Sequence, residues 1–468
     1  MPAASLAGSP RRYVRLLGLN AGQWPRASAE DGLLPDHVVP AAALEPVSRA
    51  QADNRAFAAI LAQCGGRAVL SFARRNDDGR RLGLSPLLSG RGQPVHLLRH
   101  AAPPHALSET ERLAARLPEF ADLPQAASAQ AGWRNWHSAA AGSHDGAVRP
   151  GHPMLAAIAD RLHSASSLQR LLRNPLGYLW EYGLRWSEPD LAAQQLTLDP
   201  PAFGNLVHAI LERALQDLEA GGGLGTASEQ RIGVALDTAS AAVAADWTAR
   251  VELPPALLWQ QALTDARRLG QVALTMDGPG RKQGRAYAEV PFGGADPKSA
   301  APLPWDHASA VSIGIGGAVL RIKGYIDRLD IASDGSEVVV RDYKTGKPVH
   351  ATTVLGGGAE LQRCLYAYAA RSMLGAQPAV RSTLVYPRTA CERELADLDG
   401  AMAQLAAALG SAYRSLIKGN CLPGPDCGGA YDKFTFLLPA NAASGYSKRK
   451  SAAVATILGD AAAIWELA

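Results

Sequence analysis

The chain has 468 residues, of which 47% are hydrophobic and 19% are charged, and its formal net charge is +4. This length predicts two or three globular domains, and the charge permits a phosphate-bearing partner without requiring one. Five scattered cysteines exclude a disulfide scaffold, and no apolar run is long enough for a signal peptide or a membrane span. We therefore expect a protein of the cytoplasm with no membrane partner.

Residues 1–125 have the pattern of an α/β domain. Residues 13–20 form an apolar run that predicts a strand, residues 49–66 predict a helix that ends at two glycines, and residues 67–75 predict the next strand. Residues 126–155 are small and polar with little periodicity, so we expect a linker there.

Residues 156–440 predict a second domain in which helices precede strands. Residues 203–223 have the pattern of an amphipathic helix. Residues 286–292, 311–331 and 337–345 are rich in β-branched and aromatic residues, which predicts strands. Further helices and a strand follow these, and residues 441–468 form a C-terminal tail or helix.

The turn sequence SDGS at 333–336 predicts that the last two of these strands pair as a hairpin. Such a hairpin brings Asp327 close to Asp342 and Lys344. In an extended strand, Asp342 and Lys344 share one face while Tyr343 points away. The apolar run before Asp342 predicts a strand buried on both faces, whereas the plainer alternative is a solvated ion pair on an edge strand.

Two neighbouring carboxylates repel each other and raise each other's pKa unless a cation neutralises them. Oxygen ligands of this kind suit Mg²⁺ or Mn²⁺. A lysine beside such an ion can orient or deprotonate a water molecule and stabilise charge that develops on phosphorus. The residues therefore predict phosphodiester hydrolysis.

Four motifs occur in order along the chain: Gly204 to His208 (GNLVH), GYIDRLD, DYKTG, and Gln362 to Tyr366 (QRCLY). Together they resemble the RecB-like branch of the PD-(D/E)XK nucleases. The resemblance implies a restriction-endonuclease-like core, in which a mixed central sheet is flanked by helices.

Matched residue by residue, the resemblance implies that the metal ligands are His208, Asp327, Asp342 and the carbonyl of Tyr343. It implies that Asp327, Asp342 and Lys344 are catalytic. Gln362 and Tyr366 would contact DNA or support the lysine.

Each of these residues also has a plainer interpretation. A lone histidine on a helix, such as His208, is more often a core or boundary residue than a ligand. Gln362 and Tyr366 share a helix face, which packing alone would explain. Glu289 is left out of the expected site because a half-buried strand glutamate is commonly structural.

The N-terminal block resembles the final part of the helicase-like region of AddB-type subunits of bacterial double-strand-break-processing complexes. LLGLNAGQWP, DGLLPD at 31–36 and RAVLSFARRNDDGRRLGLSPLL carry this resemblance. The chain has no G-x-x-x-x-G-K-[ST] loop for ATP phosphates. The block is therefore expected to be a remnant of a helicase-like domain, and a helicase subunit of AddA type is the expected partner.

AddB-like nuclease domains often carry a four-cysteine iron–sulfur cluster. Here only Cys421 and Cys427 keep the expected spacing, while Asn174 and Lys418 stand at the other two positions. Two thiolates cannot supply four ligands. We expect no cluster, and we expect ordinary packing to close this part of the chain.

The combined expectation is a DNA exonuclease or end-processing nuclease that acts on single-stranded DNA in double-strand-break repair. A different class of function is an idle nuclease fold that only binds or organises DNA. A third is a metal-dependent enzyme acting on RNA or on a small phosphodiester.

Overall fold

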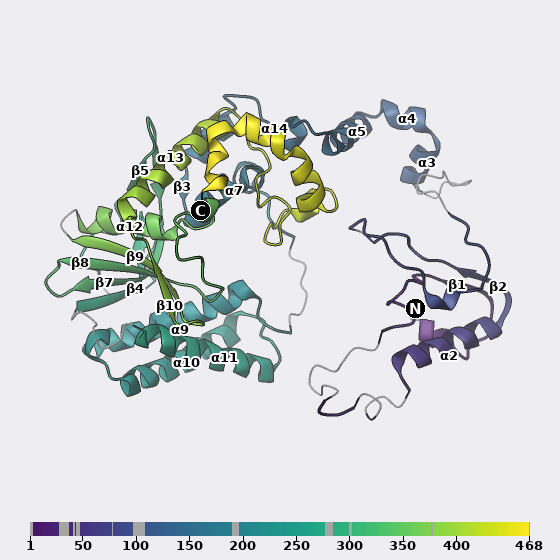
Figure 1. Cartoon of the computed structure of the whole chain (residues 1–468), viewed down its shortest axis with the longest axis horizontal. Coiled ribbons are helices and arrows are strands. Elements are labelled where there is room, and N and C mark those ends of the chain that lie inside the picture. Colours follow the sequence, from purple (N-terminus) through teal and green to yellow (C-terminus); the bar gives the residue numbers. More distant parts are fainter. Residues whose placement is uncertain are drawn as a thin grey trace. The chain divides into compact units, whose positions relative to one another are not determined.

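The structure is a computed structural model, and it divides into two compact units, Met1–Gln130 and Ala131–Ala468 (Figure 1). Each unit is described separately. The described residues are 3–27, 37–40, 43, 47–76, 78–96, 108–189, 196–276, 284–298, 302–375 and 378–467.

The first unit is built around a strand–helix–strand arrangement. Strand β1 (Arg11–Leu16) pairs in parallel with β2 (Cys64–Leu70), and α2 (Arg49–Ala62) connects them. The hydroxyl of Ser48 accepts a hydrogen bond from the backbone N–H of Gln51 and caps the start of α2. Two short helices follow, α3 (Glu109–Ala115) and α4 (Leu117–Asp122).

Alternation along β1 decides where the core of the first unit lies. Val14 and Leu16 are buried, whereas Tyr13 is exposed on the other face. The core also contains Phe57 and Ile60 from α2. The expected strands and helix are therefore present, while the DGLLPD motif at 31–36 lies outside the described residues.

The second unit contains a five-stranded mixed sheet with the order β10-β9-β8-β7-β4. Strands β8 and β9 are parallel and the other neighbours are antiparallel. The bounds are β4 (Gly284–Phe292), β7 (Gly324–Ala332), β8 (Glu337–Tyr343), β9 (Ala379–Tyr386) and β10 (Cys391–Glu394). Strand β4 therefore forms one edge of the sheet.

The stretch 311–331, which was expected to form strand, is divided between two sheets. Its first parts, β5 (Val311–Gly314) and β6 (Val319–Ile322), pair with each other and with β3 (Leu162–His163) in a small sheet. Gly316 and Gly317 have φ angles of 68° and 95°, a conformation that favours glycine and turns the chain between β5 and β6.

Helices cover both faces of the five-stranded sheet (Figure 1). One face is covered by α9 (Pro200–Ala220), α10 (Glu229–Arg250) and α11 (Ala256–Thr275). The other face packs against α12 (Gln362–Leu374) and α13 (Leu398–Ile417). The sheet is therefore the middle layer of an α/β/α arrangement, in agreement with the expected nuclease core.

The second unit contains further helices outside these two layers. They are α5 (Pro124–His137), which begins in the first unit, α6 (Pro153–Ala159), α7 (Ala165–Arg173), α8 (Pro175–Tyr178) and α14 (Lys448–Leu458). Among the described residues, no helix combines the length and the apolar character that crossing a membrane requires.

The C-terminal helix is joined to the start of the second unit by buried polar contacts. The ammonium of Lys450 lies 3.0 Å from a carboxylate oxygen of Asp145, and both side chains are fully buried. The Tyr446 hydroxyl donates to the other oxygen of Asp145 at 2.7 Å, and Lys450 donates to the carbonyl of Asn135 at 2.8 Å. Asn135 and Asp145 lie in the stretch expected as a linker, and they belong to the folded second unit.

Candidate metal centre and active site

Three adjacent strands each bring one carboxylate to the same place in the sheet. The pairs Ala288–Arg328 and Val290–Ile326 between β4 and β7 put Glu289 opposite Asp327. The β7–β8 hairpin has the register Arg328–Arg341, which places Asp342 one step further, opposite Asp327. Because directly opposite residues share a face of a sheet, the three carboxylates form a row across β4, β7 and β8.

Glu289 occupies an unusual backbone position. Its φ angle is 46°, a left-handed conformation that is uncommon for a residue with a side chain. Strand β4 changes face here, because Ala286 belongs to the core under α9 to α11 whereas Val290 belongs to the core under α12 and α13. This local strain directs a buried glutamate toward Asp327, and strain of this kind is typical of functional sites.

Helix α9 supplies the imidazole of His208. Its neighbours Leu206, Val207 and Ile210 are fully buried and anchor this turn of the helix under the sheet. His208 Nδ1 lies 3.4 Å from an oxygen of Asp327 and 4.0 Å from an oxygen of Glu289.

The other ring nitrogen of His208, Nε2, lies 3.0 Å from the carbonyl oxygen of Tyr343. The backbone N–H of Tyr343 donates to Asp327 at 2.8 Å. The ring is therefore held by a backbone carbonyl on one side and faces carboxylates on the other, which is the usual orientation of a metal-binding histidine.

The side chain of Lys344 is held at the end of β8. Its ammonium lies 2.5 Å from a carboxylate oxygen of Asp342, and it donates a hydrogen bond to the side-chain carbonyl of Gln362. Gln362 in turn donates to the Tyr366 hydroxyl at 2.9 Å. The i, i+4 pair on α12 therefore gives the lysine a second partner besides its aspartate.

Burial and mutual charge set the protonation of this site. Burial raises the pKa of Asp342 to about 7. The positive charge of Lys344 lowers this pKa, and the negative charge of Asp327 raises it. Burial also raises the pKa of Glu289. Burial works against a charged His208, but Asp327, Asp342 and Glu289 outweigh it and raise its pKa to about 9. Likewise, Asp342 outweighs burial and raises the pKa of Lys344.

The side chains fit a divalent cation. His208, Glu289 and Asp327 offer ligand atoms that all lie within 4.8 Å of one another, and we call these three residues the metal-ligand cluster. Oxygen Oδ1 of Asp342 is buried and makes no hydrogen bond to the described residues. A buried, unbonded carboxylate oxygen is costly unless a cation is nearby, and a donor set dominated by carboxylates suits Mg²⁺ or Mn²⁺.

The structure brings together the residues expected from the sequence. Asp327, Asp342 and His208 surround the Tyr343 backbone, and Lys344 lies beside Asp342. Sequence reasoning left out Glu289, which joins the cluster. Its signal in the sequence was its place at the middle of a strand that enters the same sheet, although the left-handed backbone that directs it inward has no sequence signature.

Glu289 also has a second partner. The ammonium of Lys298 lies 2.7 Å from its other carboxylate oxygen and sits 4.7 Å from the centre of the Tyr325 ring. Lys298 therefore places a cation at the rim of the metal-ligand cluster.

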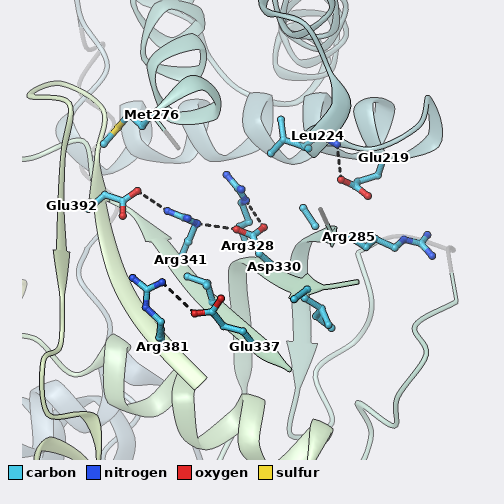
Figure 2. A pocket seen from close by; sticks show the side chains of 16 residues that line it. Glu219, Leu224, Met276, Arg285, Arg328, Asp330, Glu337, Arg341, Arg381 and Glu392 are labelled. Carbon is cyan, nitrogen blue, oxygen red and sulfur yellow. Dashed lines mark hydrogen bonds and ion pairs between the residues drawn. The ribbon is translucent and has the colours of Figure 1, made fainter. Parts of the chain in front are cut away.

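A separate, charged cavity of about 350 Å³ lies between the sheet and the ends of α9 and α11. Figure 2 shows its ion pairs: Arg328 and Arg341 both contact Asp330, and Arg341 also reaches Glu392. These contacts join β7, β8 and β10, and none of the metal-ligand cluster lines the cavity. We read this network as support for the strands that carry Asp327 and Asp342.

The region around Asn174 is closed by polar contacts. The Asn174 amide donates to Asp432 at 3.2 Å, and the neighbouring Arg173 forms an ion pair with Asp426 at 2.6 Å. Cys421 and Cys427 are free and buried, and burial raises the pKa of both thiols to about 12. Lys418 ends α13 as its C-terminal cap.

A mixed sheet between helices, with carboxylates and a lysine gathered on a strand hairpin, is consistent with a nuclease fold. The family model of the PD-(D/E)XK nuclease superfamily matches residues 163–429, which is more than half of the chain. The chain therefore belongs to the PD-(D/E)XK nuclease superfamily.

Other comparisons add little. A solved structure titled "Crystal structure of SSO0001" is similar over 61% of this chain and 94% of its own, with 14% identity and a TM-score of 0.25. A TM-score this low carries no argument about function. Comparison with curated proteins finds no match.

Proposed function

We propose that the protein is a Mg²⁺- or Mn²⁺-dependent deoxyribonuclease that hydrolyses phosphodiester bonds of single-stranded DNA. The observation that carries this proposal is the convergence of Asp327, Asp342, Lys344 and His208 on the β7–β8 hairpin of a PD-(D/E)XK nuclease domain. An idle nuclease fold would have no need to keep all of these groups together.

The proposed ligands of the metal are His208, Asp327, Asp342 and Glu289. The carbonyl of Tyr343, which was also expected as a ligand, lies on the Nε2 side of the His208 ring, so it can join this set only after the imidazole has moved. When bound, the metal supplies a Lewis acid for the phosphate and lowers the pKa of a water molecule.

The remaining chemistry belongs to side chains of the chain itself. Lys344 presents an ammonium at the edge of the carboxylate row, where it stabilises negative charge on the phosphate oxygens and orients the attacking water. Gln362 and Tyr366 hold the lysine in this position, so we assign them a supporting role.

The biological setting is part of the same proposal. We propose an exonuclease or end-processing role in double-strand-break repair with a helicase subunit of AddA type, in which residues 1–125 are the remnant of a helicase-like domain. The parallel strand–helix–strand arrangement of the first unit supports this. The five free cysteines support a reducing cytoplasm as the compartment.

We also propose that the domain carries no iron–sulfur cluster. The contacts from Arg173 and Asn174 to Asp426 and Asp432 support this, because they already join the two chain segments that such a cluster would connect.

The test is degradation of end-labelled single-stranded DNA, double-stranded DNA and RNA with Mg²⁺ or Mn²⁺. We expect metal-dependent cleavage of DNA by the wild type, and its loss in Asp342→Ala and Lys344→Ala. Val234→Ala, on the exposed face of α10, is the control and should cut normally. Cleavage that survives both site substitutions would refute the assignment of the site.

A further inference from the structure

A large cavity opens directly beside the metal-ligand cluster. It has a volume of about 700 Å³ and lies between α9, β4 and the loop that follows β4. Glu289 lines this cavity and also belongs to the cluster, so the cavity borders the proposed active site at this residue. Its size falls within the range of about 300–1,000 Å³ that is usual for sites of small organic groups.

The walls of the cavity are mainly apolar. Leu215 of α9, Ala288 and Pro291 of β4, and Pro302 and Leu303 of the loop supply them. Tyr287 also borders the cavity, and its ring packs edge-on against Trp305, with the ring centres 4.8 Å apart, in the core on the α12 and α13 side. Mainly apolar walls suit a flat ring system.

A few polar groups interrupt these walls. Glu212 and Gln216 lie one turn apart on α9, and His307 lies on the opposite side in the loop. Carboxylate, amide and imidazole groups offer both hydrogen-bond donors and acceptors. An occupant of this cavity therefore combines a flat apolar face with a polar edge, which is the chemistry of a nucleobase.

Cations stand at the mouth of the cavity. Lys298 is next to Glu289, and the exposed Arg285 lies at the start of β4 with its guanidinium 5.0 Å from the centre of the Tyr287 ring. Strand β4 is the edge strand of the sheet. A nucleic-acid backbone that follows this edge from the metal-ligand cluster passes both cations.

We propose that this cavity binds an unpaired nucleobase of the substrate strand, next to the phosphate that is cleaved. This inference rests on the proposed nuclease function and adds the selection of single strands. A base in a duplex must first be unpaired and unstacked, which costs a few kcal/mol, whereas a base of a single strand enters without that cost.

The test combines tryptophan substitutions that fill the cavity with DNA substrates that lack one base. Gln216→Trp and Ala288→Trp place an indole in the cavity from two different elements, and Val234→Trp on exposed α10 is the matched control. Each protein is assayed on single-stranded oligonucleotides that are intact or carry one abasic site. Calorimetric Mn²⁺ binding checks that the metal-ligand cluster of each variant is intact.

For the wild type we expect slower cleavage beside the abasic site, by roughly 5- to 150-fold, because a bound base is worth about 1–3 kcal/mol. The cavity-filling variants should cut intact DNA as slowly as the wild type cuts abasic DNA, with no further loss on abasic DNA. Val234→Trp should behave as wild type.

A binding assay separates the two proposals. Fluorescence anisotropy with the Asp342→Ala background, in Ca²⁺, compares intact oligonucleotide, abasic oligonucleotide and free mononucleotide without any cleavage. Weaker binding of abasic DNA, lost on cavity filling, supports the base site even if no cleavage is found. A wild type that cuts, with filled variants that cut and bind both DNAs equally well, overturns the base site and leaves the nuclease standing. Competition by mononucleotide alone would identify a nucleotide site rather than a strand site and would also overturn it.

Discussion

Acidification is expected to destabilise the protein through one buried histidine, His163, at the start of the nuclease domain. His163 lies on β3, is fully buried, and its Nε2 lies 3.1 Å from the carbonyl of Ala159. Burial lowers the pKa of this ring to about 4, and the positive charges of Arg161 and Arg321 act in the same direction. The unfolded chain takes up the proton at a pH of about 6.5, well before the native state does.

The sign and size of the effect follow from this difference in pKa. The stabilising contribution is complete above a pH of about 6.5 and is lost as the pH falls toward 4, because the unfolded state binds more protons. With these two pKa values, His163 removes about 2–3 kcal/mol of the free energy of unfolding between pH 8 and pH 4.5.

Urea unfolding, followed by tryptophan fluorescence at a series of pH values, measures this effect when wild type is compared with His163→Gln. Glutamine keeps a donor for the Ala159 carbonyl and does not titrate, so other acid effects cancel in the difference. We expect the difference in unfolding free energy between the two proteins to shift by about 2–3 kcal/mol in favour of the variant on going from pH 8 to pH 4.5. The same pH dependence of the free energy of unfolding in wild type and His163→Gln would refute the reasoning.

Three further outcomes are expected. Glu289→Gln should weaken Mn²⁺ binding by at least about tenfold in calorimetry. Glu212→Gln, which lies outside the metal-ligand cluster, should bind Mn²⁺ as the wild type does. If Glu289→Gln also binds Mn²⁺ with wild-type affinity, Glu289 is not a ligand. Gln362→Ala should lower kcat by about 10- to 100-fold with little change in KM, because the Lys344 ammonium loses one of its two partners. Gln362→Glu keeps an acceptor for Lys344 and should restore part of the lost kcat. Lys450→Ala should cost about 3–5 kcal/mol of stability in urea unfolding because it leaves Asp145 buried without its cation, and a loss below about 1 kcal/mol would contradict this.

The hairpin and its charged residues were predictable from local sequence. The SDGS turn and the alternation along β7 and β8 set which residues share a face, and Asp327 and Asp342 meet as a consequence. Glu289 was not predictable in this way, because its inward direction depends on a left-handed backbone that interrupts the alternation of β4. Simple periodicity cannot reveal such a change of face.

Long-range contacts explain the other differences. The stretch around Asn135 and Asp145 has little periodicity of its own, and its structure depends on Tyr446 and Lys450, which lie more than 300 residues further along the chain. In the same way, β6 pairs with β3, which lies more than 150 residues earlier in the chain, in a sheet separate from the main one. Sequence windows of 10 to 20 residues contain no information about such partners.

The buried contact between Asp145 and Lys450 has a consequence for the newly made protein. During synthesis, Asp145 leaves the ribosome long before its cation exists, so a chain that has been translated only to the end of α13 contains all of Asp327, Asp342 and Lys344 but cannot close the unit that holds them. Because an unpaired buried charge is strongly destabilising, this part of the nascent chain should stay open until α14 emerges. Emergence of α14 from the ribosome would then be the step that completes the nuclease domain.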